Sequence, residues 1–364
     1  MANIPWVRTR AALCAASAFA VVSAANASLP QRTFVATTGS DSAPSCSIAA
    51  PCRSFATALA KTADGGEIVV LDSGGYGPVT IGQSVAIVAP AGVYAGVSVP
   101  PAADGVVING LGVKVILHGL AVNGQGGNNG INFVQGARLS VENAAVTNMA
   151  ANGILHAASG GDLVVTDSLL RDNAQHGLLA FAAGKTVVAR TRAEKNGWSG
   201  IAIAYGARAA ISDATIVHNG QSGIVAAADG GLTTTLDVER TLLGDNAFDG
   251  INLNSQTAAS VLSVTVRRST VVRNGLNGIT VGSNSATTLA TIADSVITDN
   301  LVDGVRSTGP GARAHVTANT LSWNGIAGLH QIDAGVMVTR NNNGIEWNGT
   351  GVPAVGTIDL VDPY

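Results

Sequence analysis

A single pattern of polar and apolar positions repeats along most of the chain. Asn-x-x-x-Gly followed by Ile, Leu or Val occurs seven times, at intervals of 23, 23, 27, 28, 26 and 24 residues. A looser copy starts at Asn148 with one extra residue before its glycine, and Trp347-Asn348-Gly349 repeats Trp323-Asn324-Gly325. The strict copies begin at Asn173, Asn196, Asn219, Asn246, Asn274, Asn300 and Asn324.

Each repeat unit holds three short β-branched runs and no stretch with a helical period. Residues 163–166 (Leu-Val-Val-Thr) and 201–204 (Ile-Ala-Ile-Ala) are typical runs. Three short strands per unit, without a crossover helix, predict one coil of a solenoid rather than a βαβ unit. Successive coils then stack about 4.8 Å apart, the distance between paired strands. The sequence therefore predicts an all-β, single-domain parallel β-helix.

The repeated asparagines and glycines fit tight turns. Glycine supplies positive φ and close packing, whereas asparagine tolerates the left-handed region and bonds through its amide to the next coil. We expect the seven asparagines to form a structural ladder; the alternative is a row of ligand-binding amides. The residue after each glycine, such as Ile201, is expected in the core, and so is the residue two positions later. His156 is then an interior histidine.

Charged residues recur at two further positions of the repeat. We expect opposite charges on adjacent coils to pair, as cross-strand neighbours do. The residues before the asparagines are Asp172, Lys195, His218, Asp245, Arg273 and Asp299. The second set consists of the residues that lie six positions N-terminal to an asparagine of the repeat: Glu142, Asp167, Arg190, Asp213, Arg240, Arg268 and Asp294.

The two ends differ from the array. Residues 1–27 have the features of a signal peptide: Arg8 and Arg10, a short apolar run and a small-x-small site ending at Ala27. We expect an N-terminal cap at 28–66 with a short helix at 53–61, the β-helix at 67–352 and a C-terminal tail at 353–364. Such caps cover the open strand edges of a solenoid.

Export, charge and cysteine content narrow the class of protein. A chain beginning at Ser28 has 18 Lys and Arg against 23 Asp and Glu, a net charge of 18 − 23 = −5. No basic patch is visible, so we expect no nucleic-acid partner, and no second apolar run predicts a membrane segment in the mature chain. Cys46 and Cys52 are expected to form a disulfide in a periplasmic or extracellular protein. A metal site is the rival for this pair, but no histidine lies nearby, so we expect no metal and no cofactor.

Several segments resemble a known family. Residues 34–41 (Phe-Val-Ala-Thr-Thr-Gly-Ser-Asp), 51–55, 66–70 and 75–81 (Gly-Tyr-Gly-Pro-Val-Thr-Ile) are similar to the start of bacterial exported right-handed β-helix proteins of the pectin-lyase-like superfamily. The later units resemble the parallel β-helix repeats of that superfamily, and the resemblance spans residues 31–352. It implies right-handed coils, in line with the general rule for parallel connections. Members include pectate lyases, polygalacturonases, alginate epimerases and lyases, phage tailspikes and coils without known activity.

The catalytic signatures of that superfamily are missing from this sequence. Gly-His-Gly, Arg-Ile-Lys and Asp-Pro-His-Asp do not occur, and His118-Gly119 lacks a preceding glycine. Whether the protein is an enzyme stays open, because sites on a β-helix are assembled from separate coils.

One candidate groove follows from the strand after each glycine. Its outward residues are apolar in the first half of the array (Leu155, Leu179, Ala202, Val225) and polar in the second (Asn252, Thr280, Arg306, His330). The candidate catalytic residues are Asp249, Asp303, Arg306 and His330, since two acids two coils apart, about 10 Å, approach the separation used by inverting glycosidases. The alternative is turn chemistry, because Asp before Gly is common in turns. The candidate binding residues are Asn252, Asn254, Asn277, Trp198 and Phe248.

The apolar half forms a stripe that either a partner protein or a loop of the chain could cover. We therefore expect an exported β-helix protein that binds or presents an extended surface, with a polysaccharide as the partner. The alternatives are a polysaccharide lyase or glycoside hydrolase acting in the groove, and a structural interaction module of the cell envelope.

Overall fold

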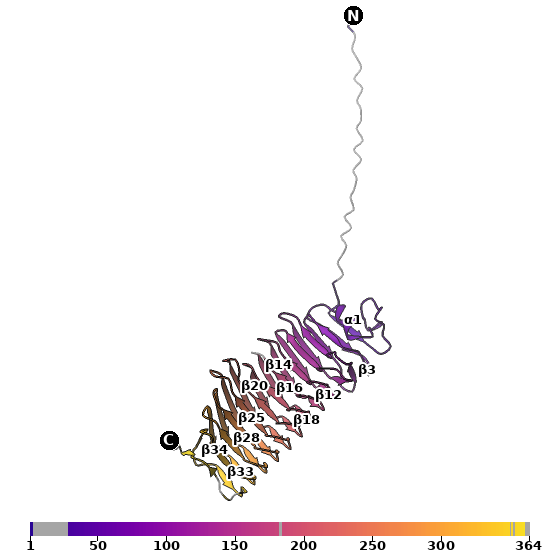
Figure 1. Ribbon diagram of the computed structural model, residues 1–364. Coiled ribbons are helices and arrows are strands. Elements are labelled where there is room, and N and C mark those ends of the chain that lie inside the picture. The colour runs from indigo at the N-terminus through magenta and orange to yellow at the C-terminus, as the bar shows by residue number, and fades with distance from the viewer. Residues whose placement is uncertain (3–27, 182–183, 350, 352–353, 361–364) are drawn as a thin grey trace.

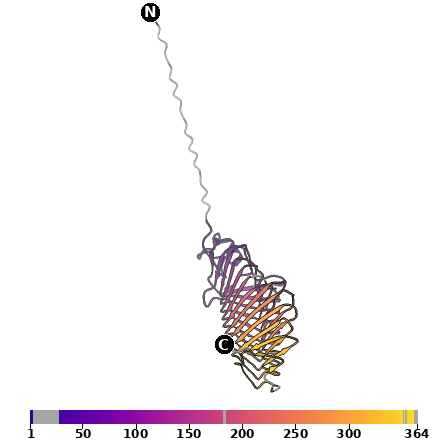
Figure 2. The same ribbon diagram turned by 90° about the vertical axis from the view of Figure 1, so that its left-hand side faces the viewer.

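The computed structural model describes residues 1–2, 28–181, 184–349, 351 and 354–360. The expected signal peptide therefore lies almost entirely outside the described residues. Within them the chain forms one elongated stack of coils, with the helix α1 (Phe55–Ala60) at the N-terminal end (Figure 1). Figure 2 shows the same stack from the side, with the strands of successive coils running alongside one another.

Three parallel sheets run the length of the stack, and each coil contributes one strand to each sheet. A 14-stranded sheet is named sheet A, and two 12-stranded sheets are named sheet B and sheet C. One coil, for example, consists of β14 in sheet A, β15 in sheet B and β16 in sheet C, after which β17 returns to sheet A. This arrangement confirms the predicted right-handed parallel β-helix.

The strands of sheet A pair in the order in which they are given: β1 (Arg32–Val35), β2 (Gly66–Val70), β5 (Val85–Val88), β8 (Lys114–His118), β11 (Arg138–Glu142), β14 (Asp162–Thr166), β17 (Lys185–Ala189), β20 (Arg208–Ser212), β23 (Thr233–Glu239), β26 (Val261–Arg267), β29 (Thr287–Ala293), β32 (Ala312–Thr317), β35 (Val336–Thr339) and β38 (Asp359–Leu360). Those of sheet B are β3 (Gly74–Gly75), β6 (Ala95–Val99), β9 (Leu120–Gly124), β12 (Ala145–Thr147), β15 (Leu169–Arg171), β18 (Arg192–Glu194), β21 (Thr215–Val217), β24 (Leu242–Gly244), β27 (Thr270–Val272), β30 (Val296–Thr298), β33 (Thr320–Ser322) and β36 (Gly344–Glu346). Those of sheet C are β4 (Val79–Ile81), β7 (Val106–Asn109), β10 (Ile131–Gln135), β13 (Ile154–His156), β16 (Leu178–Ala180), β19 (Ile201–Ile203), β22 (Ile224–Ala226), β25 (Ile251–Ser255), β28 (Ile279–Ser283), β31 (Val305–Thr308), β34 (Leu329–Ile332) and β37 (Ala354–Val355).

The interior of the coils is filled by side chains in register. The residue after each repeat glycine, from Ile154 to Leu329, is at most 1% exposed, as predicted. The column two residues later is equally buried from His156 to Ser307, whereas its last member, Gln331, is partly exposed. The Nδ1 atom of His156 lies 2.9 Å from Thr186 Oγ1, and the imidazole ring stacks on Phe133. Burial lowers the pKa of His156 to about 4, so the ring is neutral at physiological pH.

The asparagine ladder occupies the turn between sheets B and C. From Asn196 onward, each side-chain oxygen accepts hydrogen bonds from the asparagine one coil earlier: Asn219 Oδ1 accepts from Asn196 N at 3.1 Å and from Asn196 Nδ2 at 3.0 Å. Asn219 Nδ2 donates to Ala193 O and to Asn246 Oδ1. The same bonds link the seven strict asparagines and continue to Asn348.

The asparagines and glycines of the seven strict copies do not adopt the left-handed backbone conformation that we expected for them. The left-handed residue is the one before each asparagine, such as Lys195 at φ 54° and His218 at φ 57°. The repeat glycine is required for space instead: a Cβ on Gly223 would lie 2.7 Å from Gly250 O. The looser copy is also shifted by one residue, because Met149 N bonds to Asn173 Oδ1 while Asn148 is left-handed.

The N-terminal cap combines α1, β1 and a short disulfide-bonded loop. The Ser54 side chain accepts a hydrogen bond from Thr57 N and begins the helix, which buries Phe55 and Leu59. Cys46 and Cys52 form the predicted disulfide, and both bond through their backbones to Phe34 in β1. At the other end, β37 and β38 continue sheets C and A, so the described residues 354–360 extend the last coil.

Candidate functional site

The outward residues of sheet C form one continuous row. Asn252, Thr280, Arg306 and His330 are direct register partners on β25, β28, β31 and β34, and all four are partly exposed. Because the strands pair without a shift, these side chains follow one another at about 4.8 Å along the helix axis. The structure therefore brings together the polar half of the groove expected from the sequence.

A second row lies beside the first, at the residues before the repeat glycines. Asp249 Oδ1 accepts from Asn277 N at 2.9 Å and Asn277 Nδ2 at 3.1 Å, and Asn277 Oδ1 accepts from Asp303 N at 3.2 Å. The row also orients the outer residues, since Asn252 Nδ2 donates to Asp249 Oδ2 and Asn277 Nδ2 donates to Thr280 Oγ1.

The C-terminal end of these rows holds an aspartate–histidine pair. Asp303 Oδ2 lies 2.8 Å from Nδ1 of His330 on the next coil. Asp303 is completely buried, its Oδ1 has no hydrogen-bond partner among the described residues, and the His330 side chain is 15% exposed. The carboxylate fixes the orientation of the ring and leaves Nε2 as the nitrogen that can meet a ligand. Arg306 is the register neighbour of His330 and adds a cationic side chain.

The burial of the two acids limits the chemistry available. Asp249 is 3% exposed and Asp303 is not exposed at all. Both acids are engaged in the second row, so neither carboxylate is open to solvent in this structure. His330 is held by the buried Asp303, and Arg306 is the partly exposed register neighbour of His330; a catalytic role for these four residues stays a prediction.

The remaining candidate binding residues lie near this row. Asn254 is exposed on β25 and accepts a hydrogen bond from Gln256. Trp198 and Phe248, 43% and 48% exposed, occupy the same position of the turn before sheet C. They are separated by one coil, because Gln221 bonds to Trp198 O and Phe248 bonds to Gln221 O. Phe248 therefore lies in the turn before β25, the first strand of the polar row, whereas Trp198 lies two coils earlier, before β19.

The apolar half of the row differs in exposure from residue to residue. Leu155, Leu179 and Val225 are half-buried, and Ala202 is 6% exposed. Phe181 is 38% exposed and makes an edge contact with Tyr205. A protein partner at this stripe stays a prediction.

The charged columns at the turns form ion pairs between coils, as predicted. Arg190 binds Asp167 with two hydrogen bonds, and Arg240 binds Asp213 in the same way. The arginine lowers the pKa of its aspartate in each pair. A third such pair joins Arg273 and Asp245. These arginines are thus used by the fold itself.

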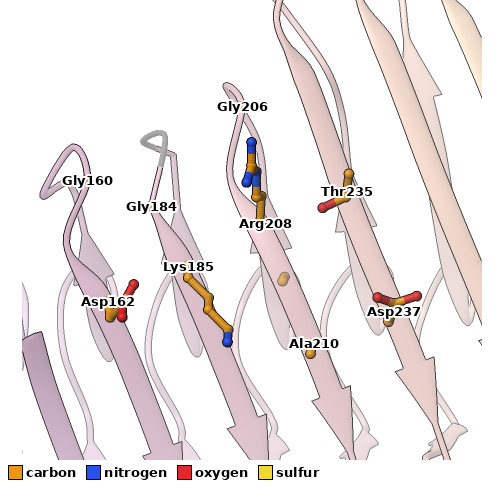
Figure 3. Close-up of a pocket in the computed structure, with 10 residues that line it drawn as sticks. Gly160, Asp162, Gly184, Lys185, Gly206, Arg208, Ala210, Thr235 and Asp237 are labelled. Atoms are coloured by element: carbon orange, nitrogen blue, oxygen red, sulfur yellow. The ribbon is translucent and has the colours of Figure 1, made fainter.

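Sequence reasoning missed a groove on the opposite part of the coil. It lies on the outer face of sheet A, spans β14, β17, β20 and β23, and has a volume of about 670 Å³. Asp162, Lys185 and Arg208 lie along it at equivalent strand positions, with Asp237 at its far side (Figure 3). The signal in the sequence is the charged residue that starts three successive sheet A strands.

The described residues contain neither a metal-binding cluster nor a membrane-spanning helix. They contain no group of three or more His, Cys, Asp or Glu side chains arranged to hold a metal ion. No helix among them is long and apolar enough to cross a membrane.

Comparison with known proteins agrees with the fold. A family model described as right handed beta helix region matches residues 104–263. The A-modules of the Azotobacter vinelandii mannuronan C-5 epimerases AlgE4 and AlgE6 are each 16% identical, with TM-scores of 0.61 and 0.59; both alignments cover 82% of this chain, and 90% and 91% of those modules. Pectate lyase Pel9A is 16% identical with a TM-score of 0.51, over 92% of this chain and 78% of that chain. No curated protein sequence matches the chain. At these identities the likeness shows the fold alone, a right-handed parallel β-helix.

Proposed function

We propose that this is an exported protein that binds an extended polysaccharide along the outer face of sheet C, from β25 to β34. The observation that carries the proposal is the unbroken in-register row of Asn252, Thr280, Arg306 and His330. A linear polymer lying along the helix axis would meet one polar side chain in each coil.

The second row supports binding because it holds the outer side chains in place before a ligand arrives. Asp249 fixes the Asn252 amide, Asn277 binds the Thr280 hydroxyl and Asp303 fixes the His330 ring. Side chains that are already ordered lose less conformational entropy on binding. Phe248 adds an exposed apolar ring before β25, where the apolar face of a sugar ring could stack, and Trp198 offers a second ring to a polymer that extends two coils further.

Two further observations support the choice of partner and compartment. Solved structures with the same fold are named as enzymes of mannuronan and pectate, so acidic polysaccharides are the first class to test. The Cys46–Cys52 disulfide fits an oxidising compartment outside the cytoplasm.

A lyase activity is the second candidate, and the Asp303–His330 hydrogen bond favours it. In such a reaction His330 Nε2 would take the proton from the carbon next to a uronate carboxyl group. The electron pair would form a carbon–carbon double bond as the adjacent glycosidic bond breaks, and the departing sugar oxygen would take up a proton from solvent. Arg306 would offset the charge that develops on the carboxylate.

Calorimetric titration of the folded protein with a panel of acidic and neutral polysaccharides tests both candidates. Arg306→Gln is expected to weaken binding, whereas Arg340→Gln, the same change at an exposed residue outside the row, leaves it unchanged. If the folded protein produces sugars with the new carbon–carbon double bond, and His330→Gln stops their formation but keeps binding, the protein is a lyase. Equal binding by Arg306→Gln and the parent protein would refute the sheet C site.

A further inference from the structure

The groove on sheet A contains cations that the fold does not use. Lys114, Arg138, Asp162, Lys185 and Arg208 are register partners on five consecutive strands, β8 to β20. They form a column with four positive charges and one negative charge, a local net charge of 4 − 1 = +3, on a chain whose net charge is −3. We name these five residues the sheet A column.

None of the five side chains forms an ion pair within the part of the chain that the structure describes. The arginines at the turns, by contrast, are paired with aspartates on adjacent coils. The column also places Lys185 directly opposite Arg208, and Lys114 opposite Arg138. Like charges in directly opposite positions of a sheet repel each other, and a bound anion would relieve that repulsion.

The groove provides room beside two of these cations, Lys185 and Arg208, and its lining also includes the acids Asp162 and Asp237. Its volume of about 670 Å³ falls within the range of ligand sites, about 300–1,000 Å³. The groove is also lined by small residues, including Ala210 and the glycines 160, 184 and 206. These leave space around the side chains of Lys185 and Arg208 (Figure 3). Four consecutive strands give it a length of about 14 Å along the helix axis.

We propose that the sheet A column is a separate binding site for a linear polyanion with one carboxylate per sugar, a polyuronate. Four cations on five consecutive coils, with Asp162 between Arg138 and Lys185, give a line of separate charges that suits a polymer with one charge per repeating unit. A nucleic acid is a poorer fit, because no aromatic side chain lines the groove and single strands are usually held by stacking on aromatic rings. This site does not depend on sheet C, since the two rows lie on different sheets.

A matched pair of charge reversals tests the proposal. Lys185→Glu changes the column, and Lys195→Glu makes the same change at an exposed turn position outside it. Both are made in the Arg306→Gln background, so that binding at sheet C is measured separately from binding at sheet A. The ligands are oligogalacturonate, a neutral glucan of equal length and a single-stranded oligonucleotide of equal charge, titrated at low and at physiological salt.

We expect oligogalacturonate to bind, with binding weakened by salt because the contacts are electrostatic. Lys185→Glu should raise the dissociation constant about tenfold, as expected for loss of a charge at a binding surface, and Lys195→Glu should leave it within about twofold. Arg208→Gln, a milder change, should weaken binding in the same direction. Circular dichroism checks that each variant is folded.

Three results would overturn the proposal. Absence of oligogalacturonate binding at low salt would show that the column is only a solvated surface. Equal effects of Lys185→Glu and Lys195→Glu would show a response to net charge alone. Equal or tighter binding of the oligonucleotide through Lys185 would assign the groove to a different class of polymer.

Discussion

Replacing Asn219 by Leu removes one member of the buried ladder and keeps the shape of the side chain. In the folded protein Asn219 Oδ1 accepts from the backbone N and from Nδ2 of Asn196, and Asn219 Nδ2 donates to Ala193 O and Asn246 Oδ1. Asn219 is 1% exposed and Asn196 is 1% exposed, so water cannot replace these partners without opening the turn.

The cost follows from the groups left without partners. Two buried donors on Asn196 lose their acceptor, and each unsatisfied buried group costs about 1–3 kcal/mol. The two losses are not independent, so we expect a destabilisation of about 2–5 kcal/mol. Asn254→Leu is the control, because Asn254 is an exposed strand residue outside the ladder and exposed substitutions usually change stability by less than about 0.5 kcal/mol.

Urea unfolding followed by tryptophan fluorescence and circular dichroism measures the difference. The midpoint of the Asn219→Leu variant should fall clearly below that of the parent and of Asn254→Leu. Because a solenoid can unfold in segments, the two probes must report the same transition before a free energy is calculated. A variant as stable as the parent would refute the account of the ladder as the polar support of the turn.

Three other predictions concern the ends and the core. The mature native N-terminus should lie at Ser28, as Edman or mass analysis of the exported protein can show; retention of Met1 would contradict export. Non-reducing mass analysis should find Cys46 and Cys52 without free thiols, and the double Cys→Ser variant should lose about 2 kcal/mol within the cap. Burial lowers the pKa of His156 from 6.5 to about 4, so the unfolded chain binds the extra proton and stability falls as pH drops from 6.5 towards 4. This loss, about 3 kcal/mol when complete, should be absent in His156→Gln; an unchanged pH dependence would show that this histidine is not buried as a neutral ring.

The repeat predicted the fold because each of its positions has one physical environment. The apolar residue after each glycine must enter the narrow interior, and the ladder asparagine has one set of partners in every coil. The reason for each residue type was harder to predict. Several side chains tolerate the left-handed position, so the sequence shows Lys195 and His218 there rather than asparagine.

The candidate site was only partly predictable for a similar reason. The period showed that Asn252, Thr280, Arg306 and His330 share a face, because register follows from the repeat. The burial of Asp303 depends on side-chain direction at a turn, which periodicity does not determine. The groove on sheet A was missed because it depends on which strand positions carry small side chains and on how the loops rise beside them.

The most direct test of the central claim is a crystal structure of the protein with an oligouronate bound to it. The account predicts sugar residues lying along the outer face of sheet C, in contact with Asn252, Arg306 and His330, one coil after another. An oligouronate bound elsewhere, with no sugar over β25 to β34, would contradict the proposed binding face.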